Sequence, residues 1–339
     1  MTKQSSALNM LLSTTTLVLL CVGWGIFALM FFLLFSVPEP GQSHPEWYLV
    51  GITLLETGAF AMACLMCYRN WQSGQIVSGR GVWLWIGAGL LCYALGNVLF
   101  YLWGNVWGKD PVVSLGDFFY LISYVFLAWG MLQAVLPRRL NMEVKQWLIV
   151  GVVGTIGVVL ALYLNGIGPF ASDEPAEVVD APVSTPVEAA APEASTPLEA
   201  STPVDGVAPA VEAPEEEVVS STAPGWVVTL DAMLEPFEES VTLIYVIGDC
   251  LLIVVATTLL AAFWGGRFSQ SWKLIAIAAF CLYIADMCFA VVGDNYQEGA
   301  LWEVFWTFSA LFFGLGAVVE HGISQRSQRS RRSSRRRRA

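Results

Sequence analysis

Carboxyl side chains lie inside several long apolar stretches of this sequence. The stretch 114–131, SLGDFFYLISYVFLAWGM, is apolar enough to cross a bilayer, yet it carries Asp117 near its start. A carboxylate inside a hydrophobic span is costly, which makes it a candidate for a functional site. The other candidates of this kind are Glu56, Asn97, Asp249, Asp286 and Glu303. Such residues suit the binding of a cation, a proton or a small ligand.

These side chains also have a purely structural interpretation. Carboxyl groups a turn or two inside a span can cap helix ends, hydrogen-bond across helices or reach headgroup water. If the helices instead turn the candidates inward, they form an outward-opening acidic pocket without an intramembrane base. Some of its crowded carboxylates would then be protonated at neutral pH unless a cation enters. The sequence leaves both interpretations open.

Long apolar runs predict the elements that would position these side chains. Hydrophobic residues make up 56% of the sequence and charged residues 13%, and the mean hydropathy is +0.61. Each run is close to the ~20 residues that a helical crossing requires, and none alternates as membrane barrel strands do. We therefore predict an all-α, polytopic helical membrane protein with eight transmembrane helices, at residues 8–37, 47–68, 82–104, 114–136, 146–167, 241–264, 273–293 and 300–320.

The basic residues predict how these helices are oriented. With both termini in the cytoplasm, every Lys and Arg lies on the inner side except Lys109, as the positive-inside rule requires. The first run is too long for a signal peptide and lacks a small-residue cleavage site, so we interpret it as an anchoring span. We predict a multi-pass protein of the cell (inner or cytoplasmic) membrane.

Composition divides the chain into four segments. Residues 1–168 form a first membrane half of four spans plus the fifth, and residues 226–321 form a second half of three spans with an interfacial lead-in. Between them, residues 169–225 are acidic and rich in Pro and Ala, with the near-repeats STPVEA, STPLEA and STPVDG. We predict that this segment is a disordered loop on the outer side. Residues 322–339 are predicted to be a disordered, basic cytoplasmic tail.

The basic tail predicts a partner. Such a run is attracted to anionic lipid headgroups by roughly 1 kcal/mol per basic residue near the surface. Membrane lipids are therefore the first partner that we predict, RNA or an acidic cytoplasmic protein is the second interpretation, and we expect no specific nucleic acid. The candidate lipid- or partner-binding residues are Arg331, Arg332, Arg335, Arg336, Arg337 and Arg338.

Two parts of the chain are similar to one another. YLVGITLL (48–55) resembles YVIGDCLL (245–252), and CYALGNVLFYLWG (92–104) resembles CLYIADMCFAVVG (281–293), which aligns Asn97 with Asp286. ALWEVFWTFSALFFGLGA aligns with the stretch 114–131, which pairs Glu303 with Asp117. Spans two to four thus resemble spans six to eight and run in the same direction, so we predict a parallel internal repeat.

Few residues suit a cofactor or a metal ion. All seven cysteines lie in apolar stretches, where a small buried side chain is the usual role. Cys64 and Cys67 form a CxxC without a second pair, and the only histidines are His44 and His321, so paired haem ligands are missing. We expect no cofactor and no metal site. Tryptophans near span ends, such as Trp306, are typical of interface anchors.

The segments LGDFFYLISYVFLAWGM, IGDCLLIVV, YIADMCFAVVGDNYQEG and LWEVFWTFSALFFGLGA together resemble a known membrane module. It is the multi-span sensor region that precedes many bacterial diguanylate cyclases and related signalling proteins, and the likeness covers roughly residues 45–136 and 241–320. We expect no cyclase, phosphodiesterase or kinase domain after the last span. The resemblance therefore implies a membrane input module that signals to a separate cytoplasmic effector protein.

Three functions remain open at this point. The first is a sensory or accessory membrane module with an acidic outer pocket. The second is a small cation- or proton-coupled transporter or channel, and the third is a structural or assembly subunit of a membrane complex. We expect that the chain is not an enzyme and has no catalytic residue. Intramembrane aspartyl peptidases carry a Gly-x-Gly-Asp pattern, and here Ser114 and Val246 occupy its first glycine position.

Overall fold

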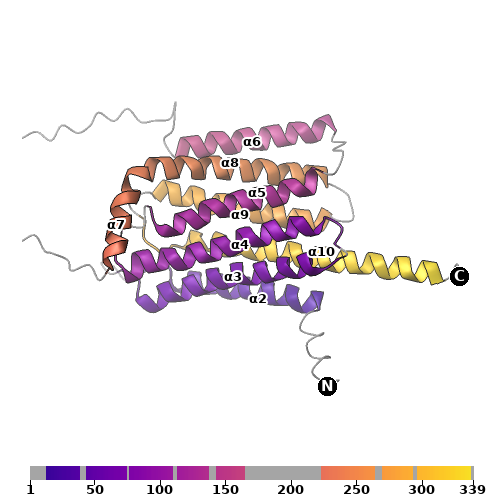
Figure 1. Ribbon diagram of the computed structural model, residues 1–339, viewed down its shortest axis with the longest axis horizontal. Coiled ribbons are helices and arrows are strands. Elements are labelled where there is room, and N and C mark those ends of the chain that lie inside the picture. The colour runs from indigo at the N-terminus through magenta and orange to yellow at the C-terminus, as the bar shows by residue number, and fades with distance from the viewer. Residues whose placement is uncertain are drawn as a thin grey trace, which may run out of the picture. The chain divides into compact units, whose positions relative to one another are not determined.

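The computed structural model describes residues 13–38, 43–74, 76–109, 113–136, 143–164, 223–263, 269–292 and 296–336. Within these ranges the secondary structure is entirely helical, and eight helices are long and apolar enough to cross a membrane. The predicted all-α, eight-helix fold is confirmed, and it is the architecture of a multi-pass membrane protein (Figure 1). Nearly all of the predicted loop 169–225 lies outside the described residues.

The helices are close to their predicted positions. The spans are α2 (Thr14–Phe35), α3 (Glu46–Gln72), α4 (Arg80–Tyr101) with its π-helical extension η1 (Leu102–Val106), α5 (Leu115–Val135), α6 (Val144–Leu164), α8 (Glu238–Ala262), α9 (Ser269–Val292) and α10 (Val304–Arg336). Short helices precede two of them, namely α7 (Gly225–Leu234) with η3 (Glu235–Phe237) before α8, and η5 (Leu301–Glu303) before α10.

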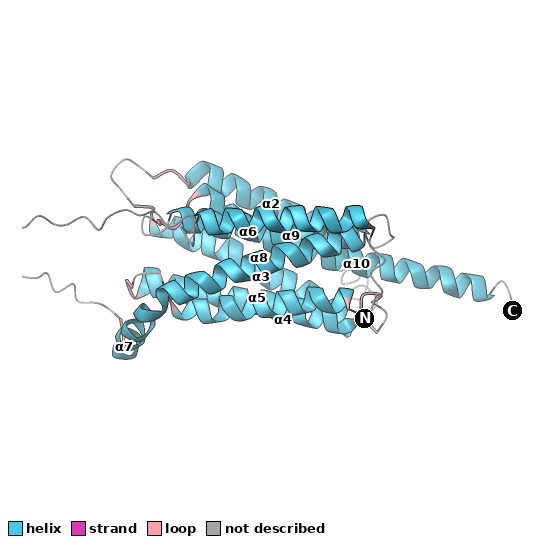
Figure 2. Ribbon diagram, turned by 90° about the horizontal axis from the view of Figure 1, so that it is seen from above, coloured by secondary structure: helices cyan, strands magenta, loops and turns pink. Residues whose placement is uncertain are grey.

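Six of the helices pack in a closed ring. Helices α3, α4 and α5 pack in sequence, α8, α9 and α10 do the same, and the contacts α5–α8 and α10–α3 join the two groups. We call these six the ring helices. Helix α2 packs on α10 and α3, whereas α6 packs on α8 and α9 (Figures 1 and 2). The first and fifth spans therefore occupy different places relative to the two groups.

Glycines allow two pairs of ring helices to approach closely at aligned positions. A Cβ atom on Gly130 of α5 would lie 3.1 Å from the backbone oxygen of Val82 in α4. A Cβ atom on Gly316 of α10 would lie 3.3 Å from the backbone oxygen of Ser271 in α9. Gly130 aligns with Gly316 in the predicted repeat, and Val82 and Ser271 occupy matching places in it. The same helix-to-helix contact thus occurs in both halves.

A polar contact recurs in the same way. The Tyr120 hydroxyl of α5 donates to Asn97 Oδ1 of α4 at 2.8 Å, and the Trp306 Nε1–H of α10 donates to Asp286 Oδ1 of α9 at 2.8 Å. Both the donors and the acceptors are aligned pairs in the sequence. The parallel repeat stays a prediction, and these matched contacts support it.

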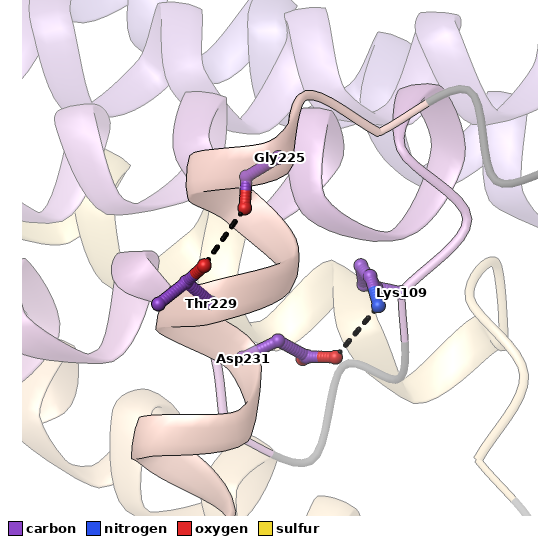
Figure 3. Close-up of polar contacts among 4 residues, drawn as sticks. All are labelled: Lys109, Gly225, Thr229 and Asp231. Carbon is purple, nitrogen blue, oxygen red and sulfur yellow. Dashed lines mark hydrogen bonds and ion pairs between the residues drawn. The ribbon is translucent and has the colours of Figure 1, made fainter.

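Helix α7 lies across one end of the bundle (Figure 1). Pro236 follows it in η3, and because proline lacks a backbone N–H, a continuous α-helix into α8 is disfavoured there. The Lys109 ammonium forms an ion pair with Asp231 of α7 at 2.9 Å (Figure 3). Trp226 packs edge-on against Trp107 with ring centroids 5.4 Å apart. These contacts fix α7 to the segment that directly follows η1.

The prediction that the chain is disordered from residue 322 onward is wrong for its first part. Helix α10 continues without interruption to Arg336 and extends past the other helices at the end opposite α7 (Figures 1 and 2). Arginine is a good helix former, and positive charge near a helix C-terminus interacts favourably with the helix dipole. Residues 337–339 lie outside the described part of the chain.

Candidate functional site

A cavity of about 340 Å³ lies among the ring helices, toward the end that carries α7. Its volume falls within the range typical of small-molecule sites. All six polar residues singled out from the sequence line it, and every ring helix supplies at least one lining residue. The residues are Glu56, Asn97, Asp117, Asp249, Asp286 and Glu303.

The sequence reasoning missed several polar lining residues. Glu238 and Glu298 bring the lining carboxyl groups to seven, and five tyrosines add hydroxyl groups, namely Tyr93, Tyr120, Tyr124, Tyr245 and Tyr296. Trp306, which we interpreted as an interface anchor, also lines the cavity. The helical spacing of Tyr120 and Tyr124 after Asp117 was a signal that these hydroxyls share a face with the carboxylate.

Asp117 caps the first turn of α5. Its Oδ2 accepts from the backbone N–H of Ser114 at 2.7 Å and from the Ser114 hydroxyl at 2.8 Å, while its Oδ1 accepts from the Tyr245 hydroxyl at 2.6 Å. Ser114 in turn accepts from Gly116 N–H at 3.1 Å. This reciprocal arrangement is a capping box. Both oxygens of Asp117 are therefore engaged within the protein.

Glu303 has the matching role before α10. Its Oε1 accepts from the backbone N–H of Gly299 at 2.8 Å and of Ala300 at 3.0 Å. Ala300 aligns with Ser114 in the predicted repeat, so the two aligned carboxylates cap the two aligned helices. For Asp117 and Glu303 the structural interpretation is thus correct, although both also line the cavity.

Asp249 and Asp286 form a different arrangement. A single hydroxyl, that of Tyr124, lies 2.8 Å from Asp249 Oδ1 and 2.5 Å from Asp286 Oδ2. The second oxygen of Asp286 accepts from Trp306. Asp249 is only 1% exposed, and its Oδ2 has no hydrogen-bond partner among the described residues. The Asp249 and Asp286 carboxyl groups also hydrogen-bond to one another, and Oδ2 is the Asp249 oxygen that a ligand in the cavity could satisfy.

A turn between α9 and α10 closes part of the cavity. Gly299 has φ +108°, a conformation that favours glycine, and its carbonyl accepts from the Tyr48 hydroxyl at 2.7 Å. Burial raises the pKa of Glu298, against the effect of hydrogen bonds from Asn105 and Thr53. Burial, and next the neighbouring carboxylates, hold the pKa of Tyr296 well above its usual range.

Apolar side chains close the cavity at the end away from α7. One from each ring helix lies a turn or two deeper than the lining residues, each is at most 1% exposed, and all belong to one packed cluster. We call this set the apolar floor, and it consists of Phe60, Leu90, Leu127, Leu252, Leu282 and Phe313. The ring of Tyr93 stacks on Phe60 with centroids 4.1 Å apart, so a cavity wall continues directly into the floor.

The cavity combines negative groups with aromatic rings. Its lining includes no Lys, Arg or His among the described residues. In the same part of the chain, no group of three or more His, Cys, Asp or Glu side chains has the spacing of a metal site. The tail residues Arg331, Arg332, Arg335 and Arg336 lie in the helical extension of α10, and nothing in the structure tests what they bind. Comparisons of this chain with protein-family models, curated proteins and solved structures found no match.

Proposed function

We propose that this protein is a membrane sensory module that binds a small cationic ligand in the acidic cavity and signals to a separate cytoplasmic effector. The proposal is based on one observation: seven carboxyl groups line a single cavity. No Lys, Arg or His is found among the described residues that line it. Desolvated carboxylates without countercharge are strongly unfavourable. A cation in the cavity would relieve this cost, and an anion would increase it.

The apolar floor supports a sensor over an open channel. Its side chains are buried and packed together across all six ring helices, so among the described residues an apolar layer closes the cavity at the end away from α7. A ligand that enters from the α7 end therefore leaves by the same end unless the helices rearrange. The predicted topology places this end on the outer side of the cell membrane.

Helix α10 supports a route for the signal. It begins beside the capping carboxylate Glu303, carries Trp306 in the cavity wall and runs to Arg336 as one helix. A ligand that moves Trp306 would move a rigid element whose far end lies beyond the bundle. The basic tail, with its affinity for anionic lipid or an acidic effector, would respond to that movement.

The proposal is tested by ligand-dependent stability of the full chain in detergent. A ligand that binds only the folded state at 100 times its Kd stabilises it by about 2.7 kcal/mol. We expect small ammonium cations to raise the melting temperature and matched neutral alcohols and carboxylates to leave it unchanged. Glu56→Gln should reduce this rise, whereas Glu46→Gln, on the exposed first turn of the same helix, should preserve it. If no cation stabilises the protein, the proposed cavity function is refuted.

A cation transporter is the second candidate. The matched contacts of α4–α5 and α9–α10 favour it, because two similar halves around a central site suit alternating access. Proteoliposomes distinguish the two candidates. If the vesicles take up a labelled ammonium cation and Asp286→Asn abolishes this uptake, the protein is a transporter. If uptake equals that of empty vesicles, the transporter is refuted and the sensory module is retained.

A further inference from the structure

The Tyr124 hydroxyl lies between the carboxyl groups of Asp249 and Asp286, which also hydrogen-bond to one another. Its oxygen lies within hydrogen-bond distance of both Asp249 Oδ1 and Asp286 Oδ2. A tyrosine hydroxyl has a single proton, so it donates to one of these oxygens only. The other contact is a hydrogen bond only when that carboxyl carries a proton and donates it to the hydroxyl oxygen. The geometry is satisfied when Asp249 and Asp286 together hold a single proton.

The side chains that surround Asp249 and Asp286, which we call the Asp249–Asp286 pair, are mostly acidic or neutral. Helix α5 presents Tyr124, α4 presents Tyr93, α9 adds Tyr283 near Asp249, α8 adds the Cys250 thiol, and α3 contributes Glu56 at longer range. Helix α10 faces the pair with the indole of Trp306 and, nearer the mouth, Glu303. Helix α6 meets α8 at Gly154 and Gly157, which carry no ionisable group. No described lining residue supplies a positive charge.

Asp249 Oδ2 determines the kind of cation that completes this site. It is a buried acceptor without a partner among the described residues, in a side chain that lines the cavity. An N–H donor on the ligand would satisfy it, whereas a quaternary ammonium has none. Tyr93 and Trp306 also line the cavity, and aromatic faces attract ammonium groups. The described carboxylates lack the spacing of a metal site.

We propose that the ligand is a small primary ammonium ion that donates to Asp249 Oδ2 and displaces the proton shared by Asp249 and Asp286. This inference rests on the proposed function, since it specifies the ligand of the same cavity. The exchange balances in charge. Before binding, the pair carries a single negative charge; afterwards, two carboxylates face one ammonium, and the released proton passes to bulk solvent. The net charge buried at the pair is unchanged, so the ligand enters without adding a desolvated charge.

The test measures protons released by the wild-type full chain. Purified protein in detergent at pH 7 is titrated with n-butylamine, a primary ammonium at this pH, by calorimetry in two buffers with different ionisation enthalpies. We expect the difference in heat to correspond to about one proton released per bound cation. By linkage, the affinity should then fall about tenfold for each pH unit below 7. n-Butanol is the neutral control, and tetramethylammonium is the control without an N–H donor.

The variants locate the exchanged proton. Asp249→Asn should lower the affinity for n-butylamine at least about tenfold and abolish proton release, while Glu239→Gln, exposed near the start of the same helix, should change neither. Tyr124→Phe keeps the ring that packs against Gly248 and removes the shared hydroxyl. It should shift the pH dependence of binding while the fold is retained, and it supplies the variant test if Asp249→Asn does not fold.

The outcomes separate this inference from the proposed function. Binding of n-butylamine without proton release, or with release that persists in Asp249→Asn, would overturn the proton exchange. Preferential binding of tetramethylammonium or of a metal ion would overturn the primary-ammonium assignment and leave a cation site in place. If none of these cations binds, the proposed function fails as well.

Discussion

Asp117 offers the sharpest test of whether a cavity-lining carboxylate supports the fold or binds the ligand. Both of its oxygens are already engaged, by Ser114 and by Tyr245. Ser114 is the N-cap of α5 and Asp117 is its partner in the capping box, and loss of such a capping interaction costs about 1 kcal/mol, with a range of about 0.5–2. Loss of a hydrogen bond to a charged group costs about 1.5–3 kcal/mol. Asp117→Ala should therefore lower the free energy of unfolding by about 2–5 kcal/mol.

A double-mutant cycle isolates the contact between α5 and α8. Tyr245→Phe removes only the hydroxyl that donates to Asp117 Oδ1, so it should cost about 1.5–3 kcal/mol. The cost of Asp117→Ala/Tyr245→Phe should be smaller than the sum of the two single costs by about 1.5–3 kcal/mol, because the shared hydrogen bond is lost only once. Glu46→Ala, exposed on the first turn of α3, is the control and should cost less than about 1 kcal/mol.

The assay is reversible unfolding in mixed micelles with increasing sodium dodecyl sulfate, followed by circular dichroism. Binding of n-butylamine is measured on the same samples, and Asp117→Asn should weaken it less than Asp249→Asn does. A free energy of unfolding that changes by less than about 0.5 kcal/mol in Asp117→Ala would refute the capping role. A loss of binding larger than that of Asp249→Asn would assign Asp117 to the ligand instead.

Three further predictions address packing, pH dependence and topology. Gly130→Ala places a Cβ against backbone atoms of α4 and should lower the melting temperature, whereas Gly151→Ala, with open space around it, should raise it slightly through helix propensity. Because the pKa of Glu298 is raised in the folded state, stability should fall as pH rises from the ordinary glutamate pKa to the raised one. Glu298→Gln should flatten this fall and Glu239→Gln should leave it unchanged. A reporter fused after Ala339 should be active only in the cytoplasm.

Each of these predictions has a contradicting result. Equal melting temperatures for the two glycine variants would show that the α4–α5 contact tolerates a methyl group. A pH profile of Glu298→Gln that coincides with that of the wild-type protein would assign the fall to other groups. A reporter that is active on the periplasmic side would overturn the predicted orientation of all the helices.

The sequence predicted the fold well because each span is a continuous apolar run of helical length. The run at residues 82–104 corresponds to α4 and η1, and the run at 241–264 corresponds to α8. The end of α10 was predicted poorly, since hydropathy marks where a helix leaves the bilayer and not where its hydrogen bonds stop. Arginine and serine residues after the span allow the helix to continue to Arg336.

The candidate site was predicted in part. Intramembrane carboxylates are rare enough that the cost of burying them identifies each one from the sequence. Their arrangement depends on contacts between distant helices, so the Tyr124 bridge between Asp249 and Asp286 was not predictable from spacing. Glu298 was missed because it lies in a turn that folds back onto the cavity, at a position fixed by the conformation of Gly299.

The central claim is that the intramembrane carboxylates converge on one cavity that holds a cation. An experimental structure of the full chain in a lipid nanodisc, determined with and without n-butylamine, tests this claim most directly. We expect ligand density in the cavity, with its nitrogen within about 3 Å of Asp249 Oδ2 and the ring of Trp306 alongside. The account is contradicted if Asp249 and Asp286 point to separate positions, or if the density for n-butylamine lies outside the cavity.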